Sequence, residues 1–299
     1  MSDVDRAIQV LRAGGLVAIP TETVYGLAAD ASNEAAVRSI FAVKARPADH
    51  PLIVHVGGAE RLGDWASAIP APAAVLADAC WPGPLTLLVP RAAHVLDVVT
   101  GGRPTVGVRV PAHPLTLELL ERFGGGLAAP SANRFGRVSP TTAEHVRADL
   151  GDDVDFVLDG GQCPVGVEST IVDCTVDPPQ VLRPGGIPTE DIAALLDDAL
   201  GAAHGPTRAP GMLDAHYAPH CEVRLVRTRA EAEAHAARTA HAEILDDADL
   251  AHFARTLYSR LRAADDRGVA TVFAVLPPAV GLGHAIRDRL TKAAASRPA

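Results

Sequence analysis

The chain has 299 residues and carries 27 basic and 36 acidic side chains, which gives a formal net charge of −9. Hydrophobic residues make up 48% of the chain and charged residues 21%, so the composition excludes a disordered or fibrous protein. The acidic balance argues against tight, sequence-independent binding of nucleic acid, because such binding depends on Lys and Arg side chains that neutralise phosphates.

The apolar residues alternate between strand and helix spacing along the first 200 residues. Strands are predicted at 16–19, 52–56, 85–89, 106–110, 127–129, 154–158, 169–174 and 180–183. Helices are predicted at 3–13, from Asn33 to about 44, at 72–80, at 114–122, from Thr141 or Thr142 to 149, and at 189–200. This alternation predicts an α/β fold with helices covering a sheet. The late strands have few helices between them, which favours a partly antiparallel, mixed sheet.

Residues 201–220 are rich in Gly, Pro and Ala and show no sustained period, so they are predicted to form a linker. Beyond them, strands at 222–226 and 269–276 and helices from about 229, at 248–264 and from about 283 predict a second, smaller α/β domain. The predicted organisation is a large N-terminal domain at 1–200, a linker at 201–220 and a C-terminal domain at 221–299.

The sequence contains neither a run of about 18 apolar residues nor a basic N-terminal segment followed by an apolar one. We therefore expect a cytoplasmic protein with no membrane partner. Its four cysteines form no CxxC pair, which favours reduced thiols. His216, His220 and Cys221 could be metal ligands, but they lack a fourth partner at the usual spacing, so no metal site is predicted.

Polar groups follow many of the predicted strands and helices, where ligands collect in α/β sheets. The cationic ones are Lys44, Arg46, Arg109 and Arg183, and the hydroxyl groups belong to Thr23, Ser131, Ser139 and Ser169. If they cluster, they form a site for phosphates or a carboxylate. Helix-end charges and surface ion pairs are the alternative roles for the cations. The chain has no P-loop and no recognisable nucleophile with its base, so the residues alone predict an anion-binding α/β protein.

These segments match a series of family motifs in order. They are PTETVYGL at 20–27, the KxR element Lys44-Ala-Arg46, HPLIVHV at 50–56, WPGPLTL at 81–87, TVGVRVPAHP at 105–114, APSAN with its SxN element at 129–133, VGVEST at 165–170, VLRPGGI at 181–187 and APGMLDAHYAP at 209–219. The chain thereby resembles the YrdC-like family of L-threonylcarbamoyl-AMP synthases in its two-domain form. The resemblance implies a YrdC-like twisted mixed sheet with an appended C-terminal domain.

The resemblance also implies the reaction. L-threonine, bicarbonate and ATP, with Mg²⁺ on the phosphates, would give threonylcarbamoyl-AMP and pyrophosphate. The product would feed the N6-threonylcarbamoyl modification of tRNA through a downstream transferase complex. Two other functions remain open, namely an enzyme of the same fold that adenylates carbamoyl phosphate, and a non-catalytic RNA-binding module. The acidic total argues against the RNA-binding module.

Site residues follow from the same resemblance. The threonine side would consist of Thr23, His55, Arg109, Ala129 and Ser169. The nucleotide side would consist of Arg46, His50, Thr105, Ser131, Asn133, Ser139, Arg183 and Tyr217. Lys44 and Arg46 are the expected catalytic pair, and His50 replaces an Asn that family members often carry. Because the product is a labile mixed anhydride, the 201–220 linker is expected to close over the site through Tyr217. Lys292, the only other lysine, is expected to be functionally silent.

Overall fold

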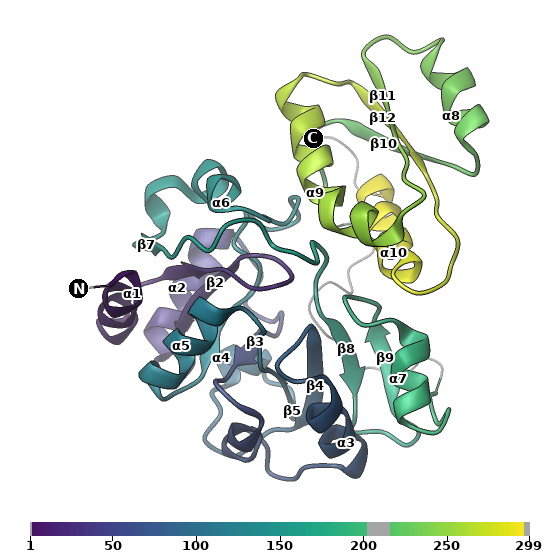
Figure 1. Cartoon of the computed structure of the whole chain (residues 1–299). Helices are drawn as coiled ribbons and strands as arrows, with labels where there is room; N and C mark the ends of the chain where they lie inside the picture. Colours follow the sequence, from purple (N-terminus) through teal and green to yellow (C-terminus); the bar gives the residue numbers. More distant parts are fainter. Residues whose placement is uncertain (1, 202–215, 296–299) are drawn as a thin grey trace.

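The computed structural model describes residues 2–201 and 216–295, and these form two α/β units of unequal size (Figure 1). The large unit holds a nine-stranded sheet with the strand order β7-β1-β2-β6-β3-β5-β4-β8-β9. Its strands are β1 (Val17–Ile19), β2 (Gly26–Asp30), β3 (Ile53–His55), β4 (Leu85–Pro90), β5 (Thr105–Arg109), β6 (Leu127–Ala128), β7 (Phe156–Val157), β8 (Thr170–Asp173) and β9 (Gln180–Arg183). The pairs β1/β7, β3/β5 and β4/β8 are parallel and the others antiparallel, which confirms the predicted mixed sheet.

Helices cover both faces of this sheet. They are α1 (Asp3–Arg12), α2 (Glu34–Lys44), η1 (Ala59–Asp64), α3 (Ala71–Cys80), α4 (Asp97–Thr100), α5 (Pro114–Phe123), α6 (Ala143–Leu150), η2 (Gly151–Asp153) and α7 (Thr189–Leu195). Val17 and Ile19 of β1 belong to the apolar cluster with α1 and α5, whereas Ala18 between them belongs to the cluster with α2. Alternate residues of one strand therefore pack into two different apolar cores. Because both faces of the strand are buried, its sequence is a continuous apolar run.

Side-chain caps set where several helices begin. The Ser2 and Asp5 side chains form a capping box at the start of α1, and the Asn33 side chain accepts a hydrogen bond from the Ala36 amide at the start of α2. Of the two candidate caps of α6, Thr142 is the one used, because its hydroxyl accepts from the His145 amide. Helix starts predicted from these polar residues agree with the structure to within a residue or two.

The second unit has a parallel three-stranded sheet with the order β10-β12-β11. Its elements are β10 (Glu222–Val226), α8 (Arg229–Ala236), β11 (Ala242–Leu245), α9 (Leu250–Asp266), β12 (Thr271–Val275) and α10 (Gly283–Ala295). This confirms a small C-terminal α/β unit. Among the described residues of the whole chain, no helix has both the length and the apolar character to cross a bilayer.

Two strands are not predicted by the sequence. Strand β2 reads Gly-Leu-Ala-Ala-Asp and has no β-branched residue, so it lacks the usual strand composition and forms because β1 and β6 pair with it on both sides. Strand β11 is likewise defined by its pairing with β12. Helix α7, predicted to reach residue 200, ends at Leu195, because Asp197 and Asp198 adopt positive φ values.

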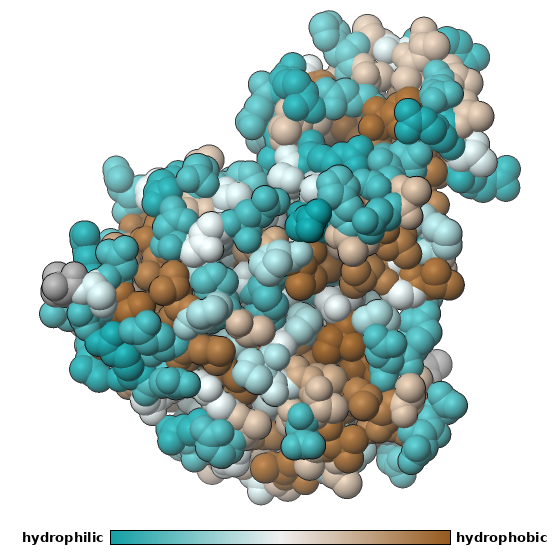
Figure 2. All heavy atoms as spheres, in the orientation of Figure 1, coloured by the Kyte–Doolittle hydropathy of each residue, from teal (hydrophilic) through white to brown (hydrophobic). Residues whose placement is uncertain are grey.

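The two units meet along α9 and α10, which face the start of β8 (Figure 1). One apolar cluster joins Val24, Val138 and Val167 of the large unit to side chains of α9 and α10. A space-filling view shows apolar residues at this junction beneath a rim of polar ones (Figure 2). Arg262 of α9 adds a partly buried ion pair with Asp149, with an N···O distance of 2.5 Å. The interface therefore combines apolar burial with directed polar contacts.

Gly166 lies where α9 comes closest to the large unit. Its φ is +81°, and a Cβ built there would lie 2.5 Å from the Arg255 Cα and 2.6 Å from the Ala254 carbonyl oxygen. Because both atoms are helix backbone, the helix could accommodate a side chain only by moving away. The glycine in the VGVEST motif thus sets how closely the second unit docks.

Gly166→Ala is expected to loosen the docking of the second unit and to lower the free energy of unfolding by about 2 kcal/mol or more. Chemical denaturation and limited proteolysis between the units would measure it. Gly161→Ala is the matched control, since Gly161 has a φ of +77° and a Cβ added to it would meet nothing within 4 Å. Equal effects of the two substitutions would show that backbone strain alone matters.

Candidate functional site

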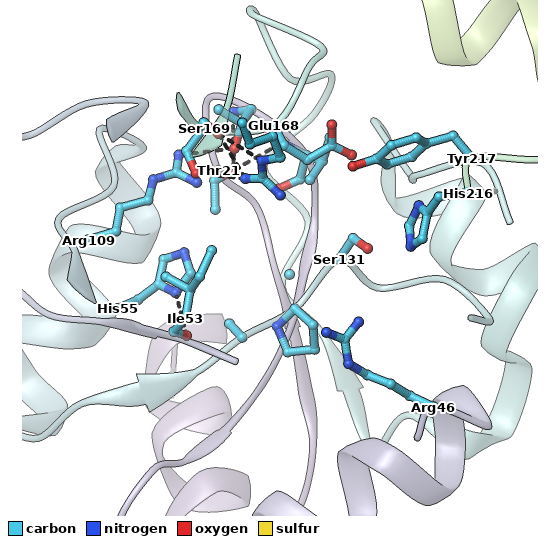
Figure 3. A pocket seen from close by; sticks show the side chains of 16 residues that line it. Thr21, Arg46, Ile53, His55, Arg109, Ser131, Glu168, Ser169, His216 and Tyr217 are labelled. Atoms are coloured by element: carbon cyan, nitrogen blue, oxygen red, sulfur yellow. Dashed lines mark hydrogen bonds between the residues drawn. The ribbon is translucent and has the colours of Figure 1, made fainter. Parts of the chain in front are cut away.

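One pocket lies where the carboxyl ends of β3 and β5 meet the loops around β2, β6 and β8, next to the second unit (Figure 3). Its lining residues are Thr21, Thr23, Val24, Gly26, Arg46, Ile53, His55, Arg109, Ala129, Pro130, Ser131, Glu168, Ser169, Arg183, His216 and Tyr217. His55 and Arg109 lie on one side of the pocket, and Arg46, His216 and Tyr217 lie on the other, with Ser131 between them (Figure 3).

All five residues expected on the threonine side line this pocket, namely Thr23, His55, Arg109, Ala129 and Ser169. Arg109 and His55 are register partners at the ends of β5 and β3, so the parallel pairing places their side chains together. The Arg109 guanidinium forms a buried ion pair with Glu22 at 2.5 Å and donates to the Thr23 hydroxyl at 3.0 Å. Glu22 therefore holds the orientation of Arg109, and the ion pair occupies the Glu22 carboxylate.

His55 is fully enclosed, and its Nδ1 lies 3.4 Å from the Ile53 carbonyl oxygen. Burial, reinforced by the neighbouring Arg109 charge, lowers the pKa of His55 to about 3. The imidazole is thus neutral at physiological pH. It offers a hydrogen-bonding group to a ligand without adding charge to the pocket.

Four of the residues expected on the nucleotide side also line the pocket, namely Arg46, Ser131, Arg183 and Tyr217. Helix α2 ends at Lys44, and Ala45 adopts a left-handed conformation that turns the chain toward Arg46. Arg46 donates to the Pro51 carbonyl at 3.1 Å. Burial lowers the pKa of Arg46 to about 10, so the guanidinium stays charged at neutral pH.

Arg183 is anchored on strand β9. Its Nε and Nη2 donate to the Ser169 carbonyl at 3.1 and 2.8 Å, and Nη2 also reaches the Ser169 hydroxyl. That hydroxyl lies 2.7 Å from the Thr86 hydroxyl. The Ser169 segment therefore links a threonine-side residue to a nucleotide-side cation, so the two halves of the pocket share a wall.

Lys44 and Asn133 do not line the pocket. The Lys44 Nζ donates to the carbonyls of Ser131 and Asn133 at 2.5 Å each, and the side chain is buried. The Asn133 amide donates to the carbonyls of Arg134 and Arg137. In this structure the KxR lysine and the SxN asparagine thus hold the loop that presents Ser131, whereas the motifs predict both as groups on the phosphate side.

His50, Thr105 and Ser139 also lie outside the pocket lining. His50 contacts the Phe135 ring, with a centroid separation of 5.4 Å. Thr105 begins β5, about 13 Å along the strand from the pocket residue Arg109. The Ser139 hydroxyl donates to the Glu168 carboxylate at 2.6 Å. Their expected nucleotide contacts stay predictions, with Ser139 connected to the pocket only through Glu168.

Seven of the lining residues are not among the predicted site residues, and two of these seven, Glu168 and His216, have titratable side chains. Glu168 lies inside the VGVEST motif, which therefore could have indicated it. His216 is a candidate metal ligand by sequence, whereas its ring packs against Tyr217 at a centroid distance of 4.2 Å. No three His, Cys, Asp or Glu side chains form a metal cluster within the described residues. Of the predicted linker, residues 202–215 lie outside the described residues.

A mixed α/β sheet with three buried arginines and several hydroxyls around one pocket defines an α/β protein with a binding site for anionic small molecules. Residues 9–185 match the Sua5, YciO and YrdC family model, described as telomere recombination, and residues 187–295 match the model of the threonylcarbamoyl-AMP synthase C-terminal domain. The chain belongs to the threonylcarbamoyl-AMP synthase family.

Two relatives and one solved structure illustrate the match. Threonylcarbamoyl-AMP synthase of Pyrococcus abyssi is 41% identical, with 96% of this chain and 92% of that protein covered. The Bacillus subtilis enzyme is 39% identical, with 98% and 93% covered. The crystal structure of P. abyssi Sua5 complexed with L-threonine superimposes with a TM-score of 0.91 at 40% identity, and covers 98% of this chain and 95% of that one. The likeness extends over both units.

Between pH 6.5 and about 3 the unfolded chain binds a proton at His55 that the folded chain does not, so folded stability falls as the pH falls through this window. In His55→Gln the free energy of unfolding should fall less steeply as the pH falls, by up to about 1.4 kcal/mol per pH unit. Urea unfolding at pH 4 to 7 measures the slope. His220→Gln, at an exposed histidine, is the control, and an unchanged slope for His55→Gln would refute the neutral buried imidazole.

Proposed function

We propose that this pocket forms L-threonylcarbamoyl-AMP from L-threonine, bicarbonate and ATP, with release of pyrophosphate. The observation that carries the proposal is the meeting of Arg46 and Arg183 with Arg109 and His55 in one pocket. Two cations on one side suit a triphosphate, and the oriented Arg109 on the other side suits the carboxylate of an amino acid. The L-threonine complex of P. abyssi Sua5 supports the choice of amino acid.

The chemistry requires no enzyme nucleophile. The threonine amine adds to CO₂ or bicarbonate and loses a proton or water to give a carbamate. A carbamate oxygen then attacks the α-phosphorus of ATP, and the bond to the β-phosphate oxygen breaks as pyrophosphate leaves in line. Such a transfer depends on positioning and on neutralising phosphate charge. Arg46 and Arg183 supply the charge, and the hydroxyls of Ser131 and Ser169 supply neutral donors.

Mg²⁺ would enter with ATP and be coordinated mainly by phosphate oxygens and water. The protein offers it few ligands, because Glu22 is paired with Arg109 and Glu168 with Arg289. Bound Mg²⁺ would add to the charge neutralisation that the arginines provide. This donor set fits a metal carried by the nucleotide better than one resident in the protein.

The carbamoyl adenylate is a mixed anhydride, so water must be kept from it. Tyr217 is buried and lies at the pocket, and the Ala218 amide donates to the Gly136 carbonyl. These contacts support closure of the pocket by the end of the linker. The labile product would pass in the cytoplasm to the transferase complex that modifies tRNA.

The direct test follows pyrophosphate release and the mass of the adenylate. ATP and bicarbonate are supplied with threonine, serine or carbamoyl phosphate in turn. A threonylcarbamoyl-AMP mass that appears only with threonine supports the proposal. Turnover with carbamoyl phosphate instead would assign the other adenylating activity, and tight, steeply salt-dependent tRNA binding without turnover would assign an RNA-binding module.

Arg46→Ala should lower the rate of adenylate formation by about 10²-fold, the scale of losing one preorganised charged donor. Single-turnover kinetics at saturating threonine measure it. Arg38→Ala is the matched control, because Arg38 is on the neighbouring helix α2, is 62% exposed and pairs only with Glu34 in the described structure. A rate for Arg46→Ala equal to that of Arg38→Ala would remove Arg46 from the reaction.

Lys292, expected to be silent, does not serve as a control lysine. Its side chain is only 14% exposed and pairs with Asp288 at 2.8 Å. It also follows Arg289 by less than one helical turn, and Arg289 reaches the pocket residue Glu168.

A further inference from the structure

Glu168 joins the pocket to the second unit. It lines the pocket, and its carboxylate is held by three side chains. The Ser139 hydroxyl donates at 2.6 Å, the Tyr258 hydroxyl lies 2.8 and 3.0 Å from the two carboxylate oxygens, and the Arg289 Nε donates at 2.7 Å. Tyr258 is on α9 and Arg289 on α10, so two of the three come from the second unit.

Arg289 is 1% exposed and also contacts Tyr217, whose ring centroid lies 5.1 Å from the guanidinium carbon. The Tyr217 ring stacks in turn on Tyr258, with centroids 5.7 Å apart and planes 28° apart. The same arginine therefore pairs with one pocket residue, Glu168, and lies against another, Tyr217. Figure 3 shows Glu168 and Tyr217 approaching each other at one side of the pocket.

The Glu168 carboxylate is ionised. Burial opposes its charge, but Arg289, Arg183 and the Ser139 hydrogen bond lower the pKa of Glu168 to about 2. A buried negative charge at the edge of a pocket for a triphosphate repels that ligand strongly unless a cation neutralises it, because solvent screening is weak there. Arg289 makes a direct ion pair with Glu168, with an N···O distance of 2.7 Å.

We infer that the C-terminal domain is an electrostatic part of the active site, with Arg289 as a positioning residue that neutralises Glu168 and so keeps the nucleotide side of the pocket positive. This inference rests on the proposed function. The inference predicts different effects on the two substrates. A Glu168 that has lost its ion pair with Arg289 should weaken ATP binding, whereas the threonine side, where Glu22 already compensates Arg109, should change little.

Arg289→Met in the full chain tests the inference, since Met keeps much of the apolar stem and removes the charge. The KM for ATP is expected to rise at least about tenfold, while the KM for threonine stays within about threefold of the wild-type value. The double variant Glu168→Gln/Arg289→Met should recover most of the lost ATP affinity, because no carboxylate remains to be neutralised. Arg229→Met is the control in the same domain, on α8 and 64% exposed.

An unchanged KM for ATP in Arg289→Met, or a double variant as impaired as the single one, would overturn the inference. Should Arg289→Met fail to fold, the double variant is compared with Glu168→Gln alone. Equal KM values for ATP support the electrostatic role, and a weaker or unfolded double variant contradicts it. A wild-type chain that makes no threonylcarbamoyl-AMP would refute the proposed function itself, which the wild-type assay decides first.

Discussion

Two buried ion pairs, Arg109 with Glu22 and Arg289 with Glu168, flank the pocket on different sides. Isolated charges are costly to bury, so each pair must form for its residues to be enclosed at all. Once formed, the pairs hold carboxylates and guanidiniums in fixed orientations. The pocket can then gather several charged groups near a ligand while the surrounding apolar clusters remain intact. The site therefore depends on each buried carboxylate being enclosed together with its arginine partner.

The remaining positive charge of the pocket comes from arginines whose backbones are held rigidly. Arg46 follows the left-handed turn that ends α2, and Arg183 ends β9 and is tied to Ser169. Lys44, at the end of the helix itself, has a different task, because its ammonium group binds two carbonyls of the loop that carries Ser131. The two cations of the KxR motif therefore make different contacts, because Lys44 binds the loop and Arg46 lines the pocket.

The second unit contributes side chains that contact the pocket residue Glu168. Tyr258 and Arg289 contact Glu168 of the large unit. Tyr217, at the end of the linker, stacks on Tyr258 and lines the pocket. Gly166 permits this closeness because α9 backbone occupies the space that a side chain would need. Docking of the domains, the charge state at Glu168 and the placement of Tyr217 are consequently coupled. A change at the interface should be felt at the nucleotide side of the pocket.

The sequence by itself determined the alternating α/β pattern, the helix start at Asn33, a helix start at Thr141 or Thr142, and the second domain, since periodicity and caps are local signals. The motifs likewise indicated the pocket residues Thr23, Arg46, His55, Arg109, Ser131 and Arg183. It did not show β2, whose strand state comes from pairing on both edges rather than from composition. Nor did it distinguish Lys44, which faces carbonyls, from Arg46, which faces the pocket. Only the tertiary structure brought Arg289 to Glu168, 121 positions apart in the chain. Such a contact depends on how two domains dock, and no local pattern of residues encodes that distance.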